Sequence, residues 1–400
     1  ATLWTSPITV TTAVQFFETL GSNHPSRLRK LHELAGSAVF VDEAHAAIPS
    51  WLWPQAWLWL KELSEKWRCH FVFASGSLAR FWELEKFLER RERIPDLVTP
   101  RLREAASEAE RRRIVYLHNS QPLDRNELLR FILSRQGPRL VILNTVQSAA
   151  VVAHDLNAAG HSVLHLSTAL TPSDRERIVT MVQGRLQTEA DGDWTLVATS
   201  CVEAGMDFSF RTAFRESCST ASLIQTGGRV NRHGEMDAAE VWDLRVLDPL
   251  LTHNPAFETS GNVLERLTAE KRIEHASATE CVTEAMRREL MSDYTTKTAV
   301  IKERERKLDY PEVDKLCRVI EADTRIVVVD KEVIAALEDG TGVSPQQLVR
   351  GSVQLYPHRV ERLALELVRG HEELYKWTGC YDPELLGYMA ELVPSLYQDT

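Results

Sequence analysis

The sequence predicts an α/β protein in which two parallel-sheet units are followed by a mostly helical part. Short apolar segments rich in β-branched residues alternate with segments of helical periodicity, and this alternation occurs twice along the chain. After about residue 250 the pattern becomes mainly helical. The length of 400 residues is also too great for one compact core, which indicates two or three domains.

The first unit contains three expected strands, Ile8–Thr12, Ala38–Val41 and His70–Ala74, separated by segments with a helical pattern. A charged stretch then follows within roughly residues 90–120 and contains Pro95 and Pro100. It predicts a solvated helix and a linker. We therefore assign residues 1–118 to a first domain and its linker.

The second unit repeats the alternation of strands and helices. The expected strands are Arg139–Asn144, Ser162–Ser167 and Trp194–Thr199, and the expected helices are Ser148–Ala159 and Ser173–Gln183, which Ser173 could cap. This pattern assigns residues 119–250 to a second parallel-sheet domain.

The remaining residues, 251–400, predict a linker and a helical C-terminal domain. Helical patterning covers Val263–Met291 and Gly351–Trp377, with one β-rich run, Thr324–Asp330, between them.

The composition limits the classes of function. The net charge is −10, so binding of a polyanion such as DNA would need a local polar or basic track. No apolar run reaches the roughly 18–20 residues of a membrane span. The six cysteines lie far apart and form no C-x-x-C pair, which favours reduced thiols and a cytoplasmic protein.

An apolar strand that ends in two carboxylates is the sharpest local signal. Val39–Val41 is followed by Asp42, Glu43, Ala44 and His45. Open parallel sheets bind ligands at the carboxyl ends of their strands. In a nucleotide-driven motor, Asp42 would hold Mg²⁺ through its water shell and Glu43 would polarise the attacking water. The alternative is an acidic strand end that caps the next helix.

Three further segments carry polar or charged residues that could take part in the same nucleotide chemistry. Ser75 and Ser77 follow the strand at residues 70–74, and the loop at residues 199–207 follows the strand that ends at Thr199. Arg229 and Arg232 are three residues apart and are predicted to lie on one face of a helical turn, where both could point at one triphosphate. An arginine presented from a second domain stabilises the transferring phosphoryl group only when the domains close.

Taken in order, these segments resemble motifs two, five and six of superfamily-two helicases. They are D-E-A-H at residues 42–45, T-x-x-x-x-x-G-x-D at residues 199–207 and Q-x-x-G-R-x-x-R at residues 225–232. The run at residues 222–234 resembles the CRISPR-associated helicase-nuclease of type I systems, with Asn231 where many RNA-directed helicases carry Gly. Ile8–Phe17 resembles that family's strand-contacting motif. The resemblance covers roughly residues 6–250, and residues 260–400 match only in position.

The resemblance implies two RecA-like domains, the first truncated at its N-terminal side, and a helical accessory domain. It implies that Asp42 binds Mg²⁺, that Glu43 is the base and that His45 links the ATP site to the second domain. Ser75 and Ser77 would couple the two sites, although the family usually shows Ser-Ala-Thr where this chain has Ser-Gly-Ser. The nucleotide and its loop would be held by Glu203, Gly205, Asp207, Gln225, Arg229 and Arg232. The DNA backbone would contact Thr11, Gln15, Asn144, Thr145, Thr199 and Ser200.

Two parts of the family pattern are missing from these 400 residues. There is no G-x-x-x-x-G-K-[ST] loop to hold the phosphates, and there is no N-terminal metal-dependent nuclease. We therefore expect the chain to be the C-terminal portion of a longer protein and to be inactive alone. A divalent transition metal is expected only in that nuclease domain.

The function implied is that of an ATP- and Mg²⁺-dependent helicase that moves along single-stranded DNA and feeds a nuclease after recruitment by an RNA-guided CRISPR surveillance complex. No membrane partner is expected. Two alternatives stay open at this point: a superfamily-two helicase of DNA repair or RNA processing, and a non-catalytic nucleic-acid-binding module with a degenerate motor.

Four tryptophans, Trp51, Trp53, Trp57 and Trp59, crowd one short segment. Trp53 and Trp57 share a helical face, so core packing is the first interpretation. Stacking on bases or contact with a partner is the alternative.

Overall fold

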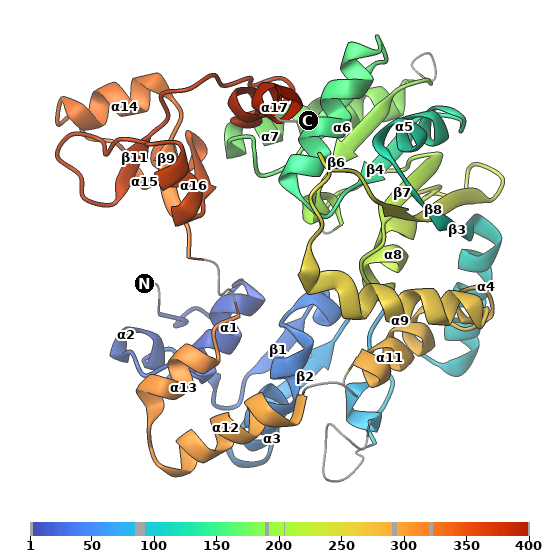
Figure 1. The fold of residues 1–400 in the computed structure, drawn as a ribbon. Helices are drawn as coiled ribbons and strands as arrows, with labels where there is room; N and C mark the ends of the chain where they lie inside the picture. The colour runs from blue at the N-terminus through green and yellow to red at the C-terminus, as the bar shows by residue number, and fades with distance from the viewer. Residues whose placement is uncertain are drawn as a thin grey trace. The chain divides into compact units, whose positions relative to one another are not determined.

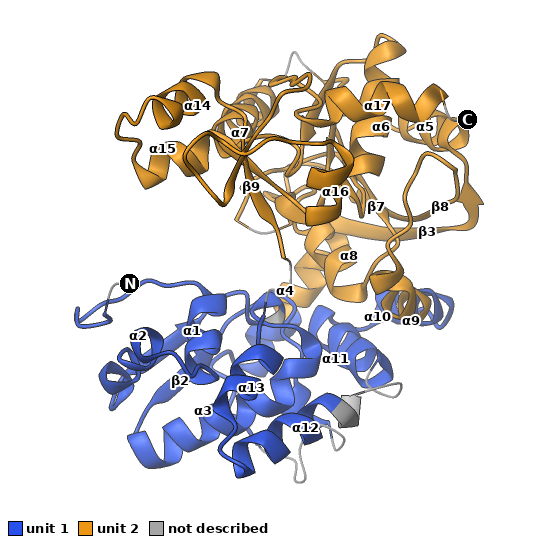
Figure 2. Ribbon diagram, turned by 60° about the vertical axis from the view of Figure 1, so that its left-hand side comes forward, with its two compact units in different colours: residues 1–104, 265–321 blue, residues 105–264, 322–400 orange. Residues whose placement is uncertain are grey.

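The computed structural model describes residues 3–84, 93–188, 192–203, 205–289, 294–319 and 323–398. The chain forms two compact units, each assembled from two separate stretches (Figure 2). Unit 1 contains residues 1–104 and 265–321, and unit 2 contains residues 105–264 and 322–400. The three-domain division stays a prediction, but residues 251–400 do not pack as one unit, because residues 265–321 pack with unit 1.

Unit 2 is built on a six-stranded parallel sheet in the order β3-β8-β7-β4-β6-β5 (Figure 1). Its strands are β3 (Ile114–Leu123), β4 (Arg139–Ile142), β5 (Val163–Leu166), β6 (Thr195–Ala198), β7 (Thr212–Glu216) and β8 (Ala239–Val246). β4 lies between β6 and β7, at the point where the chain changes the direction in which it crosses the sheet. Such a point in a parallel sheet is where loops at the carboxyl edge diverge to form a ligand site.

The helices of this part of unit 2 begin at capped residues. They are α4 (Pro100–Arg113), which runs across the boundary from unit 1, α5 (Arg125–Leu133), α6 (Val146–Ala158), α7 (Pro172–Gln187) and α8 (Thr220–Gly227). The prediction that Ser173 caps its helix is wrong. The hydroxyl of Thr171 caps α7 by accepting from Asp174 N at 3.3 Å, because Pro172 fits the first helical position and moves the start of the helix upstream.

A second sheet of unit 2 has the order β10-β9-β11 and corrects the helical prediction for Gly351–Trp377. β9 (Arg325–Val328) pairs antiparallel with β10 (Ser352–Leu355) and parallel with β11 (Leu374–Lys376). The helices beside it are α14 (Lys331–Glu338), α15 (Pro345–Arg350) and α16 (Pro357–Arg362). Val353 and Leu355 are buried and Gln354 between them is exposed, which is the period of a strand.

The last described segment of the chain packs on the part of unit 2 that contains the six-stranded sheet. α17 (Met389–Gln398) contacts α6, and Tyr381 Oη donates to Asp174 Oδ2 at 2.6 Å. A Cβ added at Gly387, where φ is +57°, would lie 2.1 Å from the carbonyl oxygen of Ala169, so only glycine permits this approach. His165 on β5 is fully buried, and its Nδ1 lies 2.5 Å from the carbonyl oxygen of Leu385.

Unit 1 contains a two-stranded parallel sheet, β1 (Ala38–Val41) and β2 (His70–Phe73). The strand expected at Ile8–Thr12 is not formed: these residues pair with no described strand, and the side chain of Val10 is 95% exposed. The helices from the first stretch are α1 (Ala13–Leu20), α2 (Pro25–Leu28) and α3 (Trp53–Trp67). The second stretch adds α10 (Arg272–His275), α11 (Ala278–Glu289), α12 (Tyr294–Arg306) and α13 (Tyr310–Leu316), after α9 (Glu258–Ala269) has crossed the boundary from unit 2.

Aromatic side chains form the core of unit 1. The ring of Trp53 stacks on Phe81 with centroids 4.6 Å apart, and the ring of Trp57 stacks on Trp82 at 5.9 Å. Trp53 and Trp57 are both buried, which confirms the core interpretation for these two residues.

The second stretch of unit 1 is fixed to the first by polar contacts. The Glu305 carboxylate on α12 accepts from Trp59 Nε1 at 2.7 Å and from Gln55 Nε2 at 3.0 Å, both on α3. Arg80 N donates to the hydroxyl of Thr283 on α11 at 2.9 Å. Residues remote in the sequence are therefore required to complete this unit.

None of the helices in the described ranges combines the length and the apolar character that crossing a membrane requires.

Removing the central ring of unit 1 is expected to weaken that unit strongly. Trp53→Ala deletes a buried indole and should lower the free energy of unfolding of unit 1 by about 3–5 kcal/mol. The matched control is Trp67→Ala at the other end of α3, where the ring is 36% exposed and the loss should stay below ~1 kcal/mol. Native-state hydrogen exchange of β1, β2 and α3 measures both changes. Equal effects of the two substitutions would contradict this assignment of the core.

Acid is expected to loosen the docking of the last segment of unit 2. Burial lowers the pKa of His165 to about 4, although the nearby Asp382 carboxylate acts in the opposite direction. An unfolded histidine has a pKa of about 6.5, so the undocked state binds the extra proton first. Docking is therefore strongest above pH ~6.5 and loses up to about 3 kcal/mol as the pH falls toward 4.

Hydrogen exchange of residues 385–398 at about pH 7.5 and about pH 5, corrected for intrinsic exchange, measures this effect. His165→Gln keeps an N–H group that can donate to Leu385 but does not titrate in this range. Its exchange should therefore depend much less on pH. An unchanged pH dependence in that variant would remove His165 as the cause.

Candidate functional site

The two carboxylates of the D-E-A-H segment lie at the carboxyl end of β1, exposed to solvent. Glu43 has a φ of +47°, which turns the chain sharply and costs a residue with a Cβ roughly 1 kcal/mol. Asp42 Oδ1 accepts from Glu43 N at 3.0 Å within this turn. The backbone of His45 belongs to a short 3₁₀ turn at Ala44–Ala46, and its side chain lies outside the described part of the structure. Asp42 and Glu43 are thus placed where they can contact a ligand.

The Ser-Gly-Ser segment adjoins this turn. Ala74 N donates to Val41 O at 3.0 Å, and Ala44 N donates to Ala74 O at 3.1 Å. Directly beyond these bonds, Ser75 Oγ accepts from the N–H of Ser77, which is itself buried, at 3.1 Å. The structure therefore brings the two predicted motifs of unit 1 together through their backbones.

Thr11 and Gln15 also lie together in unit 1. The Thr11 hydroxyl donates to Gln15 Oε1 at 2.6 Å, and both side chains are exposed. Thr12 between them caps α1 by accepting from Gln15 N at 3.1 Å. The two residues form one polar surface at the first turn of α1.

The four predicted backbone contacts of unit 2 follow neighbouring strands. Asn144 and Thr145 come after β4, Thr199 and Ser200 come after β6, and β4 pairs with β6. Ser200 is exposed, whereas Thr199 is buried with its hydroxyl 3.5 Å from the thiol of Cys201. The hydroxyl of Thr145 caps α6 by accepting from Ser148 N at 3.0 Å. Of these hydroxyl groups, that of Ser200 is the most accessible to a ligand.

Arg229 and Arg232 do not lie on one helical turn, which corrects the prediction. α8 ends at Gly227, and both arginines follow it in a loop. The buried guanidinium of Arg229 donates to three backbone carbonyls, those of Val202 at 3.2 Å, Glu203 at 2.5 Å and Met206 at 2.6 Å. Arg229 therefore holds the loop that follows β6 in a fixed shape.

Asn231 explains why the helix cannot continue through these arginines. Its φ is +42°, a left-handed conformation that glycine adopts freely and asparagine tolerates better than most residues. Its buried amide donates to the carbonyls of Met236 and Asp237 at 3.0 and 3.1 Å and accepts from Met236 N at 3.1 Å. Because of the left-handed turn and these bonds, Arg229 and Arg232 do not share one face of a helix.

Arg232 is exposed beside the loop that Arg229 holds. Its Nε lies 3.0 Å from Asp207 Oδ1, and its side chain is 41% exposed. An ion pair between exposed groups is worth about 0–1 kcal/mol, so another anion can replace Asp207. Gly205, with φ at +74°, forms the turn before Asp207, and Gln225 is half-buried on α8. Apart from Gln225, the predicted nucleotide-contacting residues of unit 2 thus belong to the loop after β6 or contact it.

Glu203, in the same loop, points to a residue that sequence analysis missed. Its Oε1 lies 2.9 Å from Nε of Arg215, a buried arginine on β7, and accepts from Ser222 Oγ at 2.6 Å. The neighbouring Glu216 is also buried, and burial raises the pKa of its carboxyl group. Arg215 and Glu216 are two charged residues at the end of an otherwise apolar strand, and this pattern was the signal in the sequence that could have identified them.

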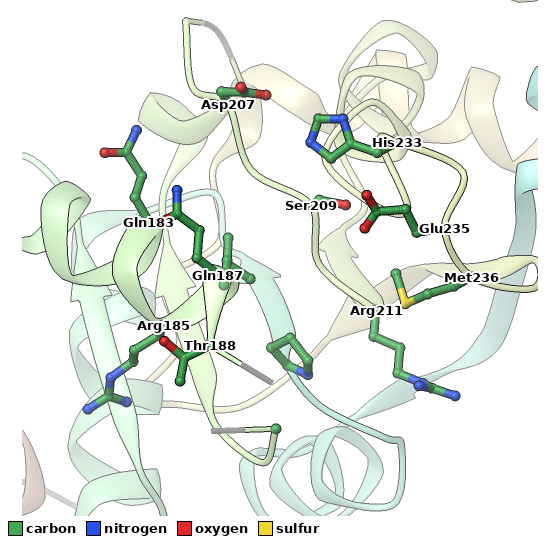
Figure 3. Close-up of a pocket in the computed structure, with 13 residues that line it drawn as sticks. Gln183, Arg185, Gln187, Thr188, Asp207, Ser209, Arg211, His233, Glu235 and Met236 are labelled. Carbon is green, nitrogen blue, oxygen red and sulfur yellow. The ribbon is translucent and has the colours of Figure 1, made fainter. Parts of the chain in front are cut away.

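Unit 2 also has an open polar cavity of about 530 Å³. Figure 3 shows Asp207, Ser209, His233 and Glu235 opposite side chains from the end of α7, among them Gln183. Of the predicted site residues, Asp207 lines it. The cavity therefore lies beside the Arg232–Asp207 pair. Within the described ranges, no cluster of three or more His, Cys, Asp or Glu side chains could hold a metal ion.

Comparisons with known proteins show what this chain is similar to. Residues 135–235 match the family model described as CRISPR-associated nuclease/helicase Cas3, C-terminal. This segment includes Asn144, the loop after β6, Arg215 and both arginines of the loop after α8. Among curated protein sequences, none matches the chain.

Solved structures with the same fold cover nearly the whole chain. Cas3 of T. fusca with AMPPNP matches with a TM-score of 0.61 and 16% identity, over 92% of this chain and 54% of that one. A CRISPR-associated protein matches with a TM-score of 0.59 and 18% identity, over 94% and 53%. A chain of a CRISPR RNA-guided surveillance complex in a pre-nicking state matches with a TM-score of 0.55 and 14% identity, over 90% and 56%.

The chain spans about half the length of these solved relatives. Their fold and the match of residues 135–235 confirm the resemblance inferred from the motifs, and with it the RecA-like class of the parallel sheets. The chain resembles the C-terminal portion of a Cas3-type CRISPR helicase-nuclease component.

Proposed function

We propose that the chain is the C-terminal portion of an ATP-dependent helicase that translocates on single-stranded DNA and acts with a nuclease in CRISPR interference. The observation that carries the proposal is the placement of Arg232. It is exposed on the loop after α8, whose shape Asn231 fixes, and it pairs with Asp207 on the loop after β6, which Arg229 holds. Both loops lie within the segment that matches the Cas3 family model.

The proposed nucleotide chemistry uses both units. Asp42 and Glu43 are exposed at a strand end, where carboxylates suit a hydrated Mg²⁺ ion and a water molecule. When bound, Mg²⁺ would neutralise part of the phosphate charge. Glu43 accepts a proton from the attacking water. Arg232 exchanges the Asp207 carboxylate for a phosphate oxygen, and its guanidinium then stabilises the charge of the transferring phosphoryl group.

The proposed DNA track consists mainly of neutral donors. Thr11 and Gln15 in unit 1, and Asn144 and Ser200 in unit 2, offer hydroxyl and amide groups to backbone phosphates. Thr145 and Thr199 lie beside Asn144 and Ser200 at the ends of β4 and β6, although the N–H of Thr199 is already donated to Leu166 O at 3.2 Å. Such contacts are indifferent to sequence and release few counterions, so affinity should fall only gently with salt. This arrangement suits a protein with a net charge of −10.

The partners of the proposed function follow from the same family. The match to a chain of a CRISPR RNA-guided surveillance complex supports recruitment by such a complex in the cytoplasm. The lysine-bearing phosphate loop and the metal-dependent nuclease would be supplied by a longer protein. A superfamily-two helicase of DNA repair or RNA processing would share the motor without the guide complex, and a degenerate module would bind DNA without hydrolysing ATP.

The decisive substitution is Arg232→Ala in the full-length protein. DNA-stimulated ATP turnover should fall by about 10³ or more, because the guanidinium acts on charge that develops in the transition state. Glu43→Gln should abolish turnover as well. Both are measured as phosphate release with saturating single-stranded DNA, followed by an unwinding assay.

Arg350→Ala is the matched control. Arg350 on α15 is 46% exposed and pairs with the exposed carboxylate of Glu176, as Arg232 pairs with Asp207, but it lies in the second sheet region of unit 2. Its loss should leave turnover within about twofold, as expected for an exposed pair. Near-normal turnover of Arg232→Ala would remove this residue from the site. A native protein that binds DNA without ATP turnover would support the degenerate module.

A further inference from the structure

A buried arginine on β7 connects two loops that the proposed function assigns to different ligands. The side chain of Arg215 is 2% exposed. Its Nε pairs with Glu203 Oε1 at 2.9 Å, and its Nη1 donates to Asn144 Oδ1 at 2.6 Å. Glu203 belongs to the loop after β6, and Asn144 belongs to the loop after β4. One guanidinium group therefore binds side chains from both loops.

The strand that carries Arg215 also fixes Asn144 from a second side. Glu216 Oε2 accepts from Asn144 N at 2.7 Å, and Asn144 Nδ2 donates to Ser217 O at 3.0 Å. With the bond from Arg215, both ends of the Asn144 amide and its backbone N–H are bound by residues 215–217. The orientation of this amide thus depends on the end of β7.

The Glu203 loop is held from two sides as well. Arg229 binds the backbone carbonyl of Glu203 at 2.5 Å, and Arg215 binds its side chain at 2.9 Å. Ser222 on α8 completes the contact by donating to Glu203 Oε1 at 2.6 Å. A displacement of this loop cannot leave the Glu203–Arg215 pair unchanged, because a buried guanidinium that loses its carboxylate is strongly destabilised.

We propose that Arg215 is a positioning residue that couples the nucleotide-contacting loop after β6 to the DNA-contacting amide of Asn144. When the loop moves with the state of the nucleotide, Glu203 shifts, Arg215 follows, and the Asn144 amide turns toward or away from the DNA backbone. The inference deepens the proposed function and rests on it. The physical basis is a continuous set of bonds from Glu203 through Arg215 to Asn144.

The arginine side chain suits this role for a geometric reason. A guanidinium presents donors in a planar fork, so Nε and Nη1 can serve two partners in different directions. A lysine ammonium at the end of a flexible chain keeps the charge but not this fixed fork. Arg215→Lys is therefore the substitution that separates coupling from charge.

The test uses the full-length protein and compares ATP turnover with and without single-stranded DNA. We expect Arg215→Lys to lower the ratio of DNA-stimulated to DNA-free turnover about tenfold, and Arg215→Met to lower it at least as much. The matched control is Arg139→Lys on β4 of the same sheet. Arg139 is 3% exposed but sits at the amino end of its strand, where it binds Arg135 O and Asp193 at 2.7 Å. Its substitution should lower the melting temperature without changing the ratio.

A double-mutant cycle provides an independent measurement. Glu203→Gln and Asn144→Ala, made singly and together, should show a coupling of about tenfold in DNA-stimulated turnover with Arg215 present and none in the Arg215→Lys background. Each coupling is calculated from variants that share one background. A general loss of stability in the Arg215→Lys background therefore does not by itself remove the coupling.

The outcomes distinguish a failure of the proposed function from a failure of the positioning role of Arg215. A native protein without DNA-stimulated turnover overturns the proposed function. If native turnover is stimulated but Arg215→Lys keeps the native ratio, or if Glu203 and Asn144 show no coupling with Arg215 present, the positioning role is overturned. If Arg139→Lys lowered the ratio equally, the loss would be due to reduced stability, and the positioning role of Arg215 would again be overturned.

Discussion

Parallel pairing of neighbouring strands is the constraint on which both groups of site residues depend. In unit 1, Val41 is paired with Phe73, so the segments that begin at Asp42 and at Ala74 leave the sheet side by side. In unit 2, Ile142 is paired with Ala198 on one side and with Arg215 on the other, which aligns three loops at one edge. A register shift of one residue would turn each of these side chains to the opposite face of its sheet.

Buried and exposed arginines have different roles in unit 2. Burying a guanidinium is costly unless every donor finds a partner, so Arg215 and Arg229 impose strict positions on the carboxylate and carbonyl groups around them. The loops that they hold can therefore move only together with these arginines. Arg232 is under no such restriction, since its ion pair with Asp207 is exposed to water. The linked loops and the exchangeable side chain together form a surface that can respond to an anion.

Apolar runs rich in β-branched residues predicted β1, β2, β4, β5 and β6, and helical periodicity predicted α6, because such patterns can be read from neighbouring residues alone. Their burial differs: β4 and β6 are buried along their whole length, whereas Phe40 on β1 is 65% exposed. These patterns missed β3, β7 and β8. His118 and Asn119 of β3 resemble a linker but pair with Asp243 and Leu244 of β8 at the edge of the sheet. The helical turn predicted for Arg229 and Arg232 failed because Asn231 between them adopts a left-handed conformation, which is held partly by a bond to the remote carbonyl of Arg113. The contacts of Arg215 join residues far apart in the chain, which no local pattern reveals. Positions at strand ends were predictable, whereas the roles assigned to them stay predictions.

The two units are interleaved along the chain, and this has a consequence for synthesis. Unit 1 needs Thr283 and Glu305 to complete its contacts with Arg80 and α3, yet residues 105–264, which belong to unit 2, are made in between. At typical rates of translation this interval lasts on the order of 10 s. Unit 2 in turn waits for Leu385 to cover His165. Neither unit can finish folding as it emerges from the ribosome. In unit 1, Trp59 of α3 and Trp51 before it stay without their α12 contacts until residues 294–306 have been translated. Any ribosomal pause before that point prolongs the exposure of this surface to chaperones and proteases.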